Sequence, residues 1–153
     1  LAASGARFLL IRTSWLYGKG GPNFVDTMLR LFMEKNEVRV VMDQFGSPTY
    51  APDLADAILK VITSDSENYG TYHFTNEGKT DWCGFARQIY KNAVERGLVN
   101  KDIRIMPIST NEYPSKMRRP ENSYMSKEKF KKVFGIKIRS WQTALDEFIK
   151  GKS

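Results

Sequence analysis

The sequence has little of what several classes of protein require. Its 153 residues include one Cys and one His, which excludes a disulfide framework and a zinc site built from several cysteines. The longest apolar run, Phe8–Ile11, is far too short to cross a bilayer, so no membrane partner is expected. With 41% hydrophobic and 27% charged residues, the composition is that of a globular chain. The length suits one compact domain, and the reducing cytoplasm is the expected location.

Acidic side chains do not balance basic ones in the last third of the chain. Residues 1–100 are neutral overall, so the whole net charge of +7 falls in residues 101–153. Such a segment can attract nucleic acid, a membrane surface or an acidic small molecule. However, Phe130, Val133 and Phe134 recur at helical spacing, which predicts that the lysines around them form a solvated helix face. No aromatic–basic repeat or zinc-finger spacing supports a nucleic-acid partner, and none is expected.

A start residue is also missing, because the chain begins with Leu1 rather than Met. The first residues indicate the end of a helix that begins upstream. No basic segment precedes an apolar one, so a signal peptide is not indicated. We therefore expect the chain to be a fragment of a longer protein.

Short apolar runs alternate with amphipathic segments along the chain, which indicates an α/β domain. The first run is apolar throughout and is typical of a strand buried on both faces of a parallel sheet. The expected strands are 8–13, 38–41, 71–75 and 103–108. The expected helices are 23–35, one from Pro52, 81–96, 127–134 and 141–150, with Asn23, Thr80 and a serine before each of the last two as N-caps.

Three loops carry side chains that could bind a ligand: Arg12–Gly18, Asp43–Tyr50 and Arg118–Ser123. The first follows a strand, where ligands sit in open α/β sheets, although its aromatics would also serve as packing residues. The second could bind a planar base, but turn formation alone would select the same residues. The third has paired arginines suited to phosphate, or it is an exposed basic loop.

Five short segments carry a more specific signal in their order. They are Arg12-Thr13-Ser14-Trp15-x-Tyr17-Gly18, Asn23-Phe24-Val25-x-Thr27-Met28-Leu29, Asp43-Gln44-x-Gly46-Ser47-Pro48-Thr49, Asp53-Leu54-Ala55 and Arg119-Pro120-x-Asn122-Ser123. In this order they resemble the dTDP-4-dehydrorhamnose reductase family, a branch of the extended short-chain dehydrogenase/reductases. The resemblance covers nearly the whole chain but only the C-terminal half of such an enzyme. It implies the C-terminal part of a Rossmann-like NAD(P)-binding fold, at 1–22 and about 50–80, and a small α/β substrate-binding domain, at about 23–49 and 81–153.

The resemblance implies an oxidoreductase that uses NADPH, or NADH, to convert dTDP-4-dehydro-L-rhamnose into dTDP-L-rhamnose for polysaccharide biosynthesis. In that family a Tyr-x3-Lys pair supplies the proton, because the lysine lowers the pKa of the tyrosine, and a glycine-rich loop holds the cofactor. This sequence contains neither motif, since no Tyr has Lys four residues later. The catalytic pair is therefore expected upstream of Leu1. The isolated chain is expected to be inactive and not to bind the cofactor alone.

The resemblance also implies roles for residues on the substrate side. Trp15 would pack against the deoxysugar, Asn23 would face the substrate, and Arg119 would pair with the diphosphate. A Mg²⁺ ion at a dimer interface is left open. The remaining implied positions are Gln44 and Ser47 at the nucleotide end, and Thr13 and Ser14 near the nicotinamide.

The expected partners are a dTDP-sugar and either a second copy of the chain or the missing N-terminal half. An apolar strand without sheet neighbours favours such association. The alternative is a non-catalytic nucleotide-sugar-binding or regulatory subunit of the same fold, similar to the regulatory subunit of methionine adenosyltransferase. Retained dTDP binding would favour the enzyme lineage, whereas tight binding to a protein without nucleotide-sugar affinity would favour the subunit.

Overall fold

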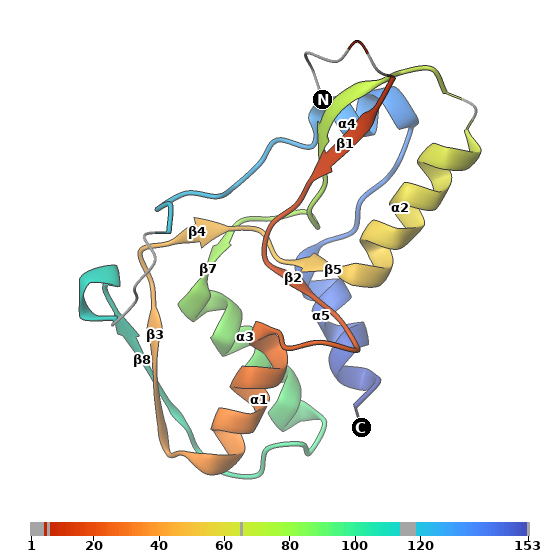
Figure 1. Ribbon diagram of the computed structural model, residues 1–153. Coiled ribbons are helices and arrows are strands. Elements are labelled where there is room, and N and C mark those ends of the chain that lie inside the picture. The colour runs from red at the N-terminus through yellow and green to blue at the C-terminus, as the bar shows by residue number, and fades with distance from the viewer. Residues whose placement is uncertain (1–4, 6, 65, 114–118, 153) are drawn as a thin grey trace.

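The computed structural model describes residue 5 and residues 7–64, 66–113 and 119–152. These residues form short strands and five α-helices (Figure 1). The strands are β1 Leu9–Arg12, β2 Leu16–Tyr17, β3 Glu37–Val41, β4 Phe45–Gly46, β5 Thr49–Tyr50, β6 Gly70–His73, β7 Thr80–Asp81 and β8 Arg104–Ile108. The helices are α1 Phe24–Glu34, α2 Ala51–Thr63, α3 Trp82–Glu95, α4 Glu128–Phe134 and α5 Trp141–Lys150, with a 3-10 turn at Thr110–Glu112.

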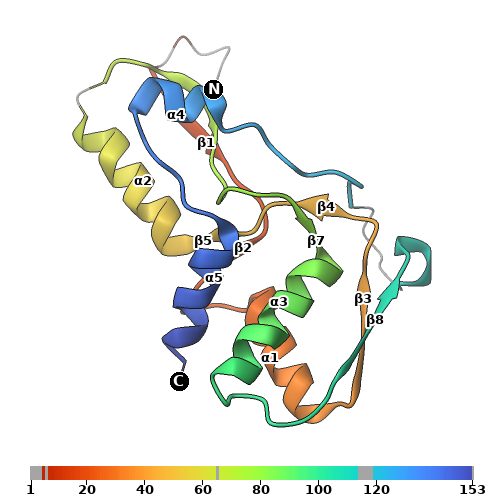
Figure 2. The same ribbon diagram turned by 180° about the vertical axis from the view of Figure 1, so that it is seen from behind.

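The strands pair two by two. Three of the pairs, β1 with β6, β2 with β5 and β3 with β8, are parallel, and β4 pairs antiparallel with β7. The β1–β6 pair lies near the N-terminus and the β3–β8 pair at the opposite end of the molecule, with the two short pairs between them (Figures 1 and 2). The mixture of parallel strands and helices confirms the expected α/β class.

The larger hydrophobic core lies where α3 packs against α1, α5 and the β3–β8 pair. Each helix turns an apolar stripe inward because its hydrophobic residues recur every three or four positions. The side chains of Phe32, Ile89 and Leu145 are fully buried there, one from each helix.

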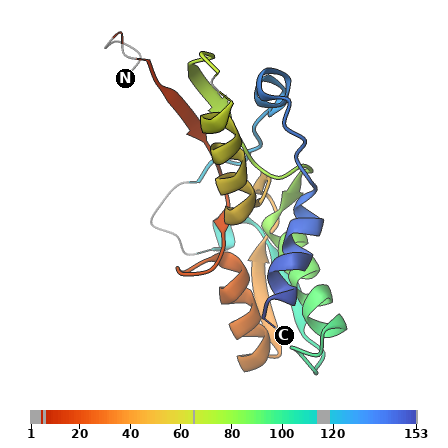
Figure 3. The ribbon, with the colours of Figure 1, turned by 90° about the vertical axis from the view of Figure 1, so that its right-hand side faces the viewer.

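A second, smaller core lies beside the β1–β6 pair. Ala57 and Val61 of α2 pack there with Tyr72 and Phe74 from β6 and the residue after it, and with Phe130 of α4. Figure 3 shows β1 at the outer edge of this end of the molecule. The division of the chain into a Rossmann part and a substrate part, at the residues given above, stays a prediction.

The expected elements are confirmed, and Asn23 caps α1 as predicted by accepting a hydrogen bond from the backbone N–H of Asp26. Two caps differ from expectation. The N-cap of α3 is Asp81 rather than Thr80, because the Asp81 carboxylate reaches the N–H of Gly84. The N-cap of α4 is Lys127 rather than a serine, whereas Ser140 caps α5 as expected.

Two expectations about burial are wrong. Strand β1 is not buried on both faces: Leu9 is 36% exposed, since within the described residues only β6 pairs with it. Lys127 does not lie on a solvated face, because its side chain is buried beside Glu77. None of the helices in the described part of the chain is long and apolar enough to cross a membrane.

Candidate functional site

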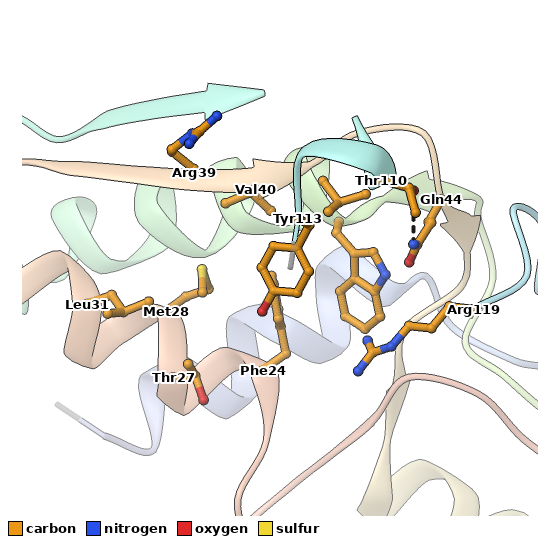
Figure 4. Close-up of a pocket in the computed structure, with 12 residues that line it drawn as sticks. Phe24, Thr27, Met28, Leu31, Arg39, Val40, Gln44, Thr110, Tyr113 and Arg119 are labelled. Atoms are coloured by element: carbon orange, nitrogen blue, oxygen red, sulfur yellow. Dashed lines mark hydrogen bonds between the residues drawn. The ribbon is translucent and has the colours of Figure 1, made fainter. Parts of the chain in front are cut away.

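An apolar pocket of about 290 Å³ opens between α1 and β3 (Figure 4). One wall comes from α1, through Phe24, Met28 and Leu31, and another from β3, through Val40 and Val41. The wall is apolar because both elements turn core-forming residues towards each other. The polar groups around it are Thr27, Arg39, Gln44, Thr110, Tyr113 and Arg119.

A second pocket of about 340 Å³ adjoins the first. Trp15, Pro120 and Ser123 line only this second pocket, whereas Gln44, Trp82 and Arg119 line both. We call the two together the binding cleft, with a Trp15 end and an α1 end. Arg119 and Gln44 therefore lie at the junction, where they could contact the middle of a long ligand.

Two tryptophans stack at the Trp15 end. The ring centroids of Trp15 and Trp82 lie 3.6 Å apart and their planes differ by 12°. Trp15 is the one non-glycine residue in the described ranges with a positive φ, 49°. This left-handed backbone costs a bulky residue roughly 1–2 kcal/mol, so tertiary contacts must hold it. Thr49 supplies two of them, because its N–H donates to the carbonyl of Trp15 and its hydroxyl to the carbonyl of Ser14.

The junction of the cleft is fixed by a small polar network. The Gln44 side chain, 7% exposed, donates from Nε2 to the Thr110 hydroxyl at 3.0 Å. Asp43 accepts hydrogen bonds from the same hydroxyl and from the N–H of Thr110. These bonds hold the pKa of Asp43 below its usual range, so the carboxylate is charged at neutral pH. The network ties the turn that precedes Tyr113 to the end of β3, and Figure 4 shows the Tyr113 ring extending towards α1.

Arg119 is placed by the segment that follows it. The N–H of Phe45 donates to the carbonyl of Glu121 at 2.7 Å, and the N–H of Ser123 donates to the carbonyl of Phe45 at 2.8 Å. The Arg119–Ser123 segment thus runs along β4 like a short added strand. Its arginine is exposed and lines both pockets, and an arginine fork suits a phosphate or diphosphate. Arg118, the other arginine of the expected pair, lies outside the described residues.

The structure brings together three of the residues implied for the site, Trp15, Gln44 and Arg119. Four others do not line the cleft. Thr13 donates to the Thr49 hydroxyl, and Ser14 donates to the carbonyl of Ser47. Asn23 uses its side-chain oxygen as a helix cap and its amide on Gly18, Gly21 and Asp26, and the fully buried Ser47 donates to the carbonyl of Gly78. The roles assigned to all seven residues stay predictions.

Sequence reasoning missed Trp82, Thr110 and Tyr113. Trp82 reads as one more apolar residue at the start of a helix, next to the buried Cys83. Nothing in the sequence distinguishes Trp82 from the other apolar residues of this helix. Thr110 and Tyr113 join the site through the contact of their turn with Asp43, which no local pattern reveals.

Tyr17 is the tyrosine whose pKa departs furthest from the ordinary value. Burial raises the pKa, and the charge of Asp53 and the nearby Tyr50 raise it further. The Tyr17 hydroxyl is therefore neutral, and Tyr17 does not line the cleft. It is a core residue, packed against Phe85 and Phe148, rather than a proton donor for a ligand in the cleft.

Comparison with known families identifies the chain. A family model described as the RmlD substrate binding domain matches residues 1–153. The chain belongs to this family. The resemblance inferred from five short segments is thereby confirmed.

Curated relatives of this RmlD-type chain include two that span most of it. The spore coat polysaccharide biosynthesis protein SpsK of Bacillus subtilis (strain 168) is 44% identical over 144 residues, which are 94% of this chain and 47% of that protein. The dTDP-4-dehydrorhamnose reductase of Aggregatibacter actinomycetemcomitans is 39% identical over 141 residues, 90% of this chain and 48% of that protein. The chain thus spans about half the length of the curated relatives it matches.

Solved structures agree with this assignment. The crystal structure of dTDP-4-dehydrorhamnose reductase from Bacillus anthracis str. Ames in complex with NADP superposes with a TM-score of 0.84 at 39% identity, over 94% of this chain and 48% of that one. A UDP-glucuronic acid 4-epimerase from Bacillus cereus, 12% identical, has a TM-score of 0.71 and shares the fold alone. The fold is therefore that of the RmlD reductases and related short-chain dehydrogenases.

That this chain alone does not bind a nicotinamide dinucleotide stays a prediction. The sequence has no glycine-rich dinucleotide loop and no Tyr-x3-Lys pair. The hydroxyls of Thr13 and Ser14 are already engaged within the protein. Across the described ranges, no three His, Cys, Asp or Glu side chains converge as metal ligands, and Mg²⁺ stays an open prediction.

Proposed function

We propose that this chain is the substrate-binding side of a dTDP-4-dehydrorhamnose reductase, an NADP(H)-dependent enzyme that makes dTDP-L-rhamnose for polysaccharide biosynthesis. The family match and the reductases at 39% identity support the reaction class. The proposal includes NADPH as the preferred cofactor and the cytoplasm as the location.

The observation that carries the proposal is the order of groups along the binding cleft. A nucleotide sugar has a sugar at one end, a diphosphate in the middle and a nucleoside at the other end. The cleft has the indole of Trp15 at one end, Arg119 at the junction, and an apolar pocket at the other end. Placing the diphosphate at Arg119 puts the deoxysugar against Trp15 and the nucleoside between α1 and β3.

The reaction adds a hydride to the carbonyl carbon of the sugar and a proton to its oxygen. The chain has neither the tyrosine–lysine pair that delivers the proton in the family nor the glycine-rich loop that holds the cofactor there. Its own residues bind and orient the sugar, and the stacked tryptophans exclude water from one face of it. We therefore propose that this chain alone does not turn over substrate.

The test is the binding of dTDP, measured by calorimetry on the chain and on the variant Arg119→Ala. A lost charge-assisted hydrogen bond should cost about 1.5–3 kcal/mol, which weakens binding about 10- to 150-fold. The matched control is Arg87→Ala on α3, because Arg87 is exposed and lines neither pocket. We expect its affinity to equal that of the unchanged chain.

Three outcomes would contradict parts of the proposal. Equal affinity of Arg119→Ala and the unchanged chain would remove this arginine from the site. A chain that binds no dTDP but binds a protein tightly would favour the regulatory-subunit alternative. Oxidation of NADPH by the chain alone, on addition of dTDP-4-dehydro-L-rhamnose, would overturn its role as the substrate side only.

A further inference from the structure

Trp15, which has a left-handed backbone, packs against Trp82 and against Gly46. Trp82 covers one face of its indole ring, and Phe24 packs against Trp82 in turn, with ring centroids 4.6 Å apart. Trp82 is the first residue of α3, directly after the N-cap Asp81. Its position is therefore set by a capped helix rather than by a free loop.

The edge of the Trp15 ring lies against Gly46. A Cβ atom added at Gly46 would lie 2.7 Å from Cε2 and 2.9 Å from Cζ2 of Trp15, and 2.6 Å from the hydroxyl of Ser123. These separations are shorter than van der Waals contact, so a side chain there must displace both neighbours or shift the backbone of residue 46. The φ angle of Gly46 is not positive, so the reason for glycine is space and not backbone conformation.

One strand pair brings both neighbours to Trp15. Strands β4 and β7 are antiparallel, with Phe45 opposite Asp81 and Gly46 opposite Thr80. Gly46 ends β4, and Trp82 follows β7 directly. The short ladder therefore holds the edge contact and the face contact in one fixed arrangement.

We propose that Gly46 and Trp82 are positioning residues that hold the indole of Trp15 in the orientation that receives the sugar. This inference rests on the proposed function, in which Trp15 faces the deoxysugar. Trp82 packs against one face of the Trp15 ring, and Gly46 leaves space for the edge of the same ring. Together these contacts maintain the left-handed backbone at residue 15. A side chain at residue 46 alters the sugar end of the cleft without touching the ligand.

The first experiment follows the indole pair itself. Two indoles stacked at 3.6 Å couple their electronic transitions. When the transition dipoles are rotated relative to each other within the stack, the coupling gives a couplet, which is a paired positive and negative band in far-ultraviolet circular dichroism. We expect this couplet in the unchanged chain, its loss in Trp15→Phe and Trp82→Phe, and its retention in Trp141→Phe. In Gly46→Ala, which keeps all three tryptophans, the couplet should weaken or disappear. Gly21→Ala is the matched control, because no heavy atom lies within 4 Å of a Cβ added there.

The second experiment separates the sugar from the nucleotide. The affinities for dTDP and for dTDP-L-rhamnose are measured on the unchanged chain, Ser123→Ala, and the double variant Gly46→Ala/Ser123→Ala. Ser123→Ala removes the hydroxyl that a Cβ at residue 46 would otherwise meet, so the added methyl acts on Trp15 rather than on the Arg119–Ser123 segment. Compared with Ser123→Ala, we expect the double variant to have the same dTDP affinity. Of the additional affinity that the sugar provides, it should lose about 3- to 10-fold. Trp82→Leu serves as a second test of that loss.

The outcomes decide between the alternatives. An unchanged couplet in Gly46→Ala, or an equal loss of affinity for both ligands in the double variant, overturns the inference. If the unchanged chain shows the couplet but binds neither ligand, the proposed function fails and with it the role towards the sugar. The response of the couplet to Gly46→Ala then still decides whether Gly46 positions Trp15.

Discussion

Arg139 joins segments that are distant in the sequence through ion pairs with Asp53 and Glu147. Its guanidinium donates to both carboxylate oxygens of Asp53, from Nε at 3.1 and 2.9 Å and from a terminal nitrogen at 2.6 Å, and it also donates to Glu147. Asp53 is only 14% exposed and accepts a further hydrogen bond from Asn76. The cluster ties the first turn of α2 to α5, so Asp-Leu-Ala at 53–55 has a structural use as well as a place in the family pattern.

Asp53→Ala should therefore destabilise the protein. The change leaves the side-chain amide of Asn76 and two nitrogens of the Arg139 guanidinium without their charged acceptor. This loss should lower the free energy of unfolding by about 1.5–3 kcal/mol. Urea unfolding followed by circular dichroism measures the difference. The control is Asp56→Ala. Asp56 is also an aspartate, lies about one helix turn further along α2 and is exposed, so its loss should have a much smaller effect. Equal losses in the two variants would show that the Asp53–Arg139 contact adds nothing.

At the scale of elements, one carboxylate adds an ionic contact to the packing of Phe130, which holds α4 against the rest of the molecule. The Nζ atoms of Lys127 and Lys131 lie 3.4 and 3.1 Å from the carboxylate oxygens of Glu77. Lys127 is 2% exposed and also lies over the ring of Tyr124. Burial raises the pKa of Glu77, but the hydrogen bond from Lys131 and the positive charges of both lysines together outweigh it, so the pKa falls below its ordinary value of 4.5.

A lowered carboxylate pKa fixes the sign of the pH dependence. The stabilisation is complete above the ordinary pKa of 4.5 and is lost as the pH falls through the lower value of the folded state. Glu77→Gln should thus lower the free energy of unfolding by about 1–2 kcal/mol at neutral pH, and the difference from the unchanged protein should shrink in acid below 4.5. Urea unfolding at neutral pH and at a pH below 4.5 measures this difference in the free energy of unfolding. Glu67→Gln, in an exposed pair with Arg7, is the control, and a difference that persists in acid would contradict the role of Glu77.

At the scale of the whole molecule, the end that carries β1 and α2 keeps apolar surface in contact with solvent. Within the described residues β1 pairs with β6 only, so its other edge has no partner strand. Strands of parallel sheets are normally buried within the sheet and covered on both faces. Leu59 and Ile62 of α2 are 60% and 67% exposed, and Leu16 is 51% exposed. Surface of this kind favours association.

We predict that the chain self-associates at micromolar concentration or binds an apolar dye strongly. Light scattering should give a mass above that of the monomer. The double variant Leu59→Lys/Ile62→Lys should reduce both signals, because it charges the most exposed apolar side chains of α2. Val94→Lys, at an exposed position of α3, should leave them unchanged. A clean monomer with little dye binding would contradict the prediction.

Much of the fold could be predicted because its signals are local. Helix α1 follows from the spacing of its apolar residues and from a cap that reaches only three residues along the chain. The parallel class follows from short apolar runs that alternate with helices. The burial of Lys127 could not be predicted, because the carboxylate that compensates its charge, on Glu77, lies some fifty residues away in the sequence.

The sequence by itself determined the helices and the four longer strands of this protein, its family and three residues of the cleft, since capping, periodicity and ordered motifs are properties of neighbouring residues. The short strands β2, β4, β5 and β7 were not predicted. Only the tertiary structure decided which side chains meet. It placed Trp82 on Trp15, the edge of that ring against Gly46, and Gln44 on Thr110. Each pair joins segments that are far apart along the chain, and their meeting depends on how strands pair and helices pack, which no local pattern specifies.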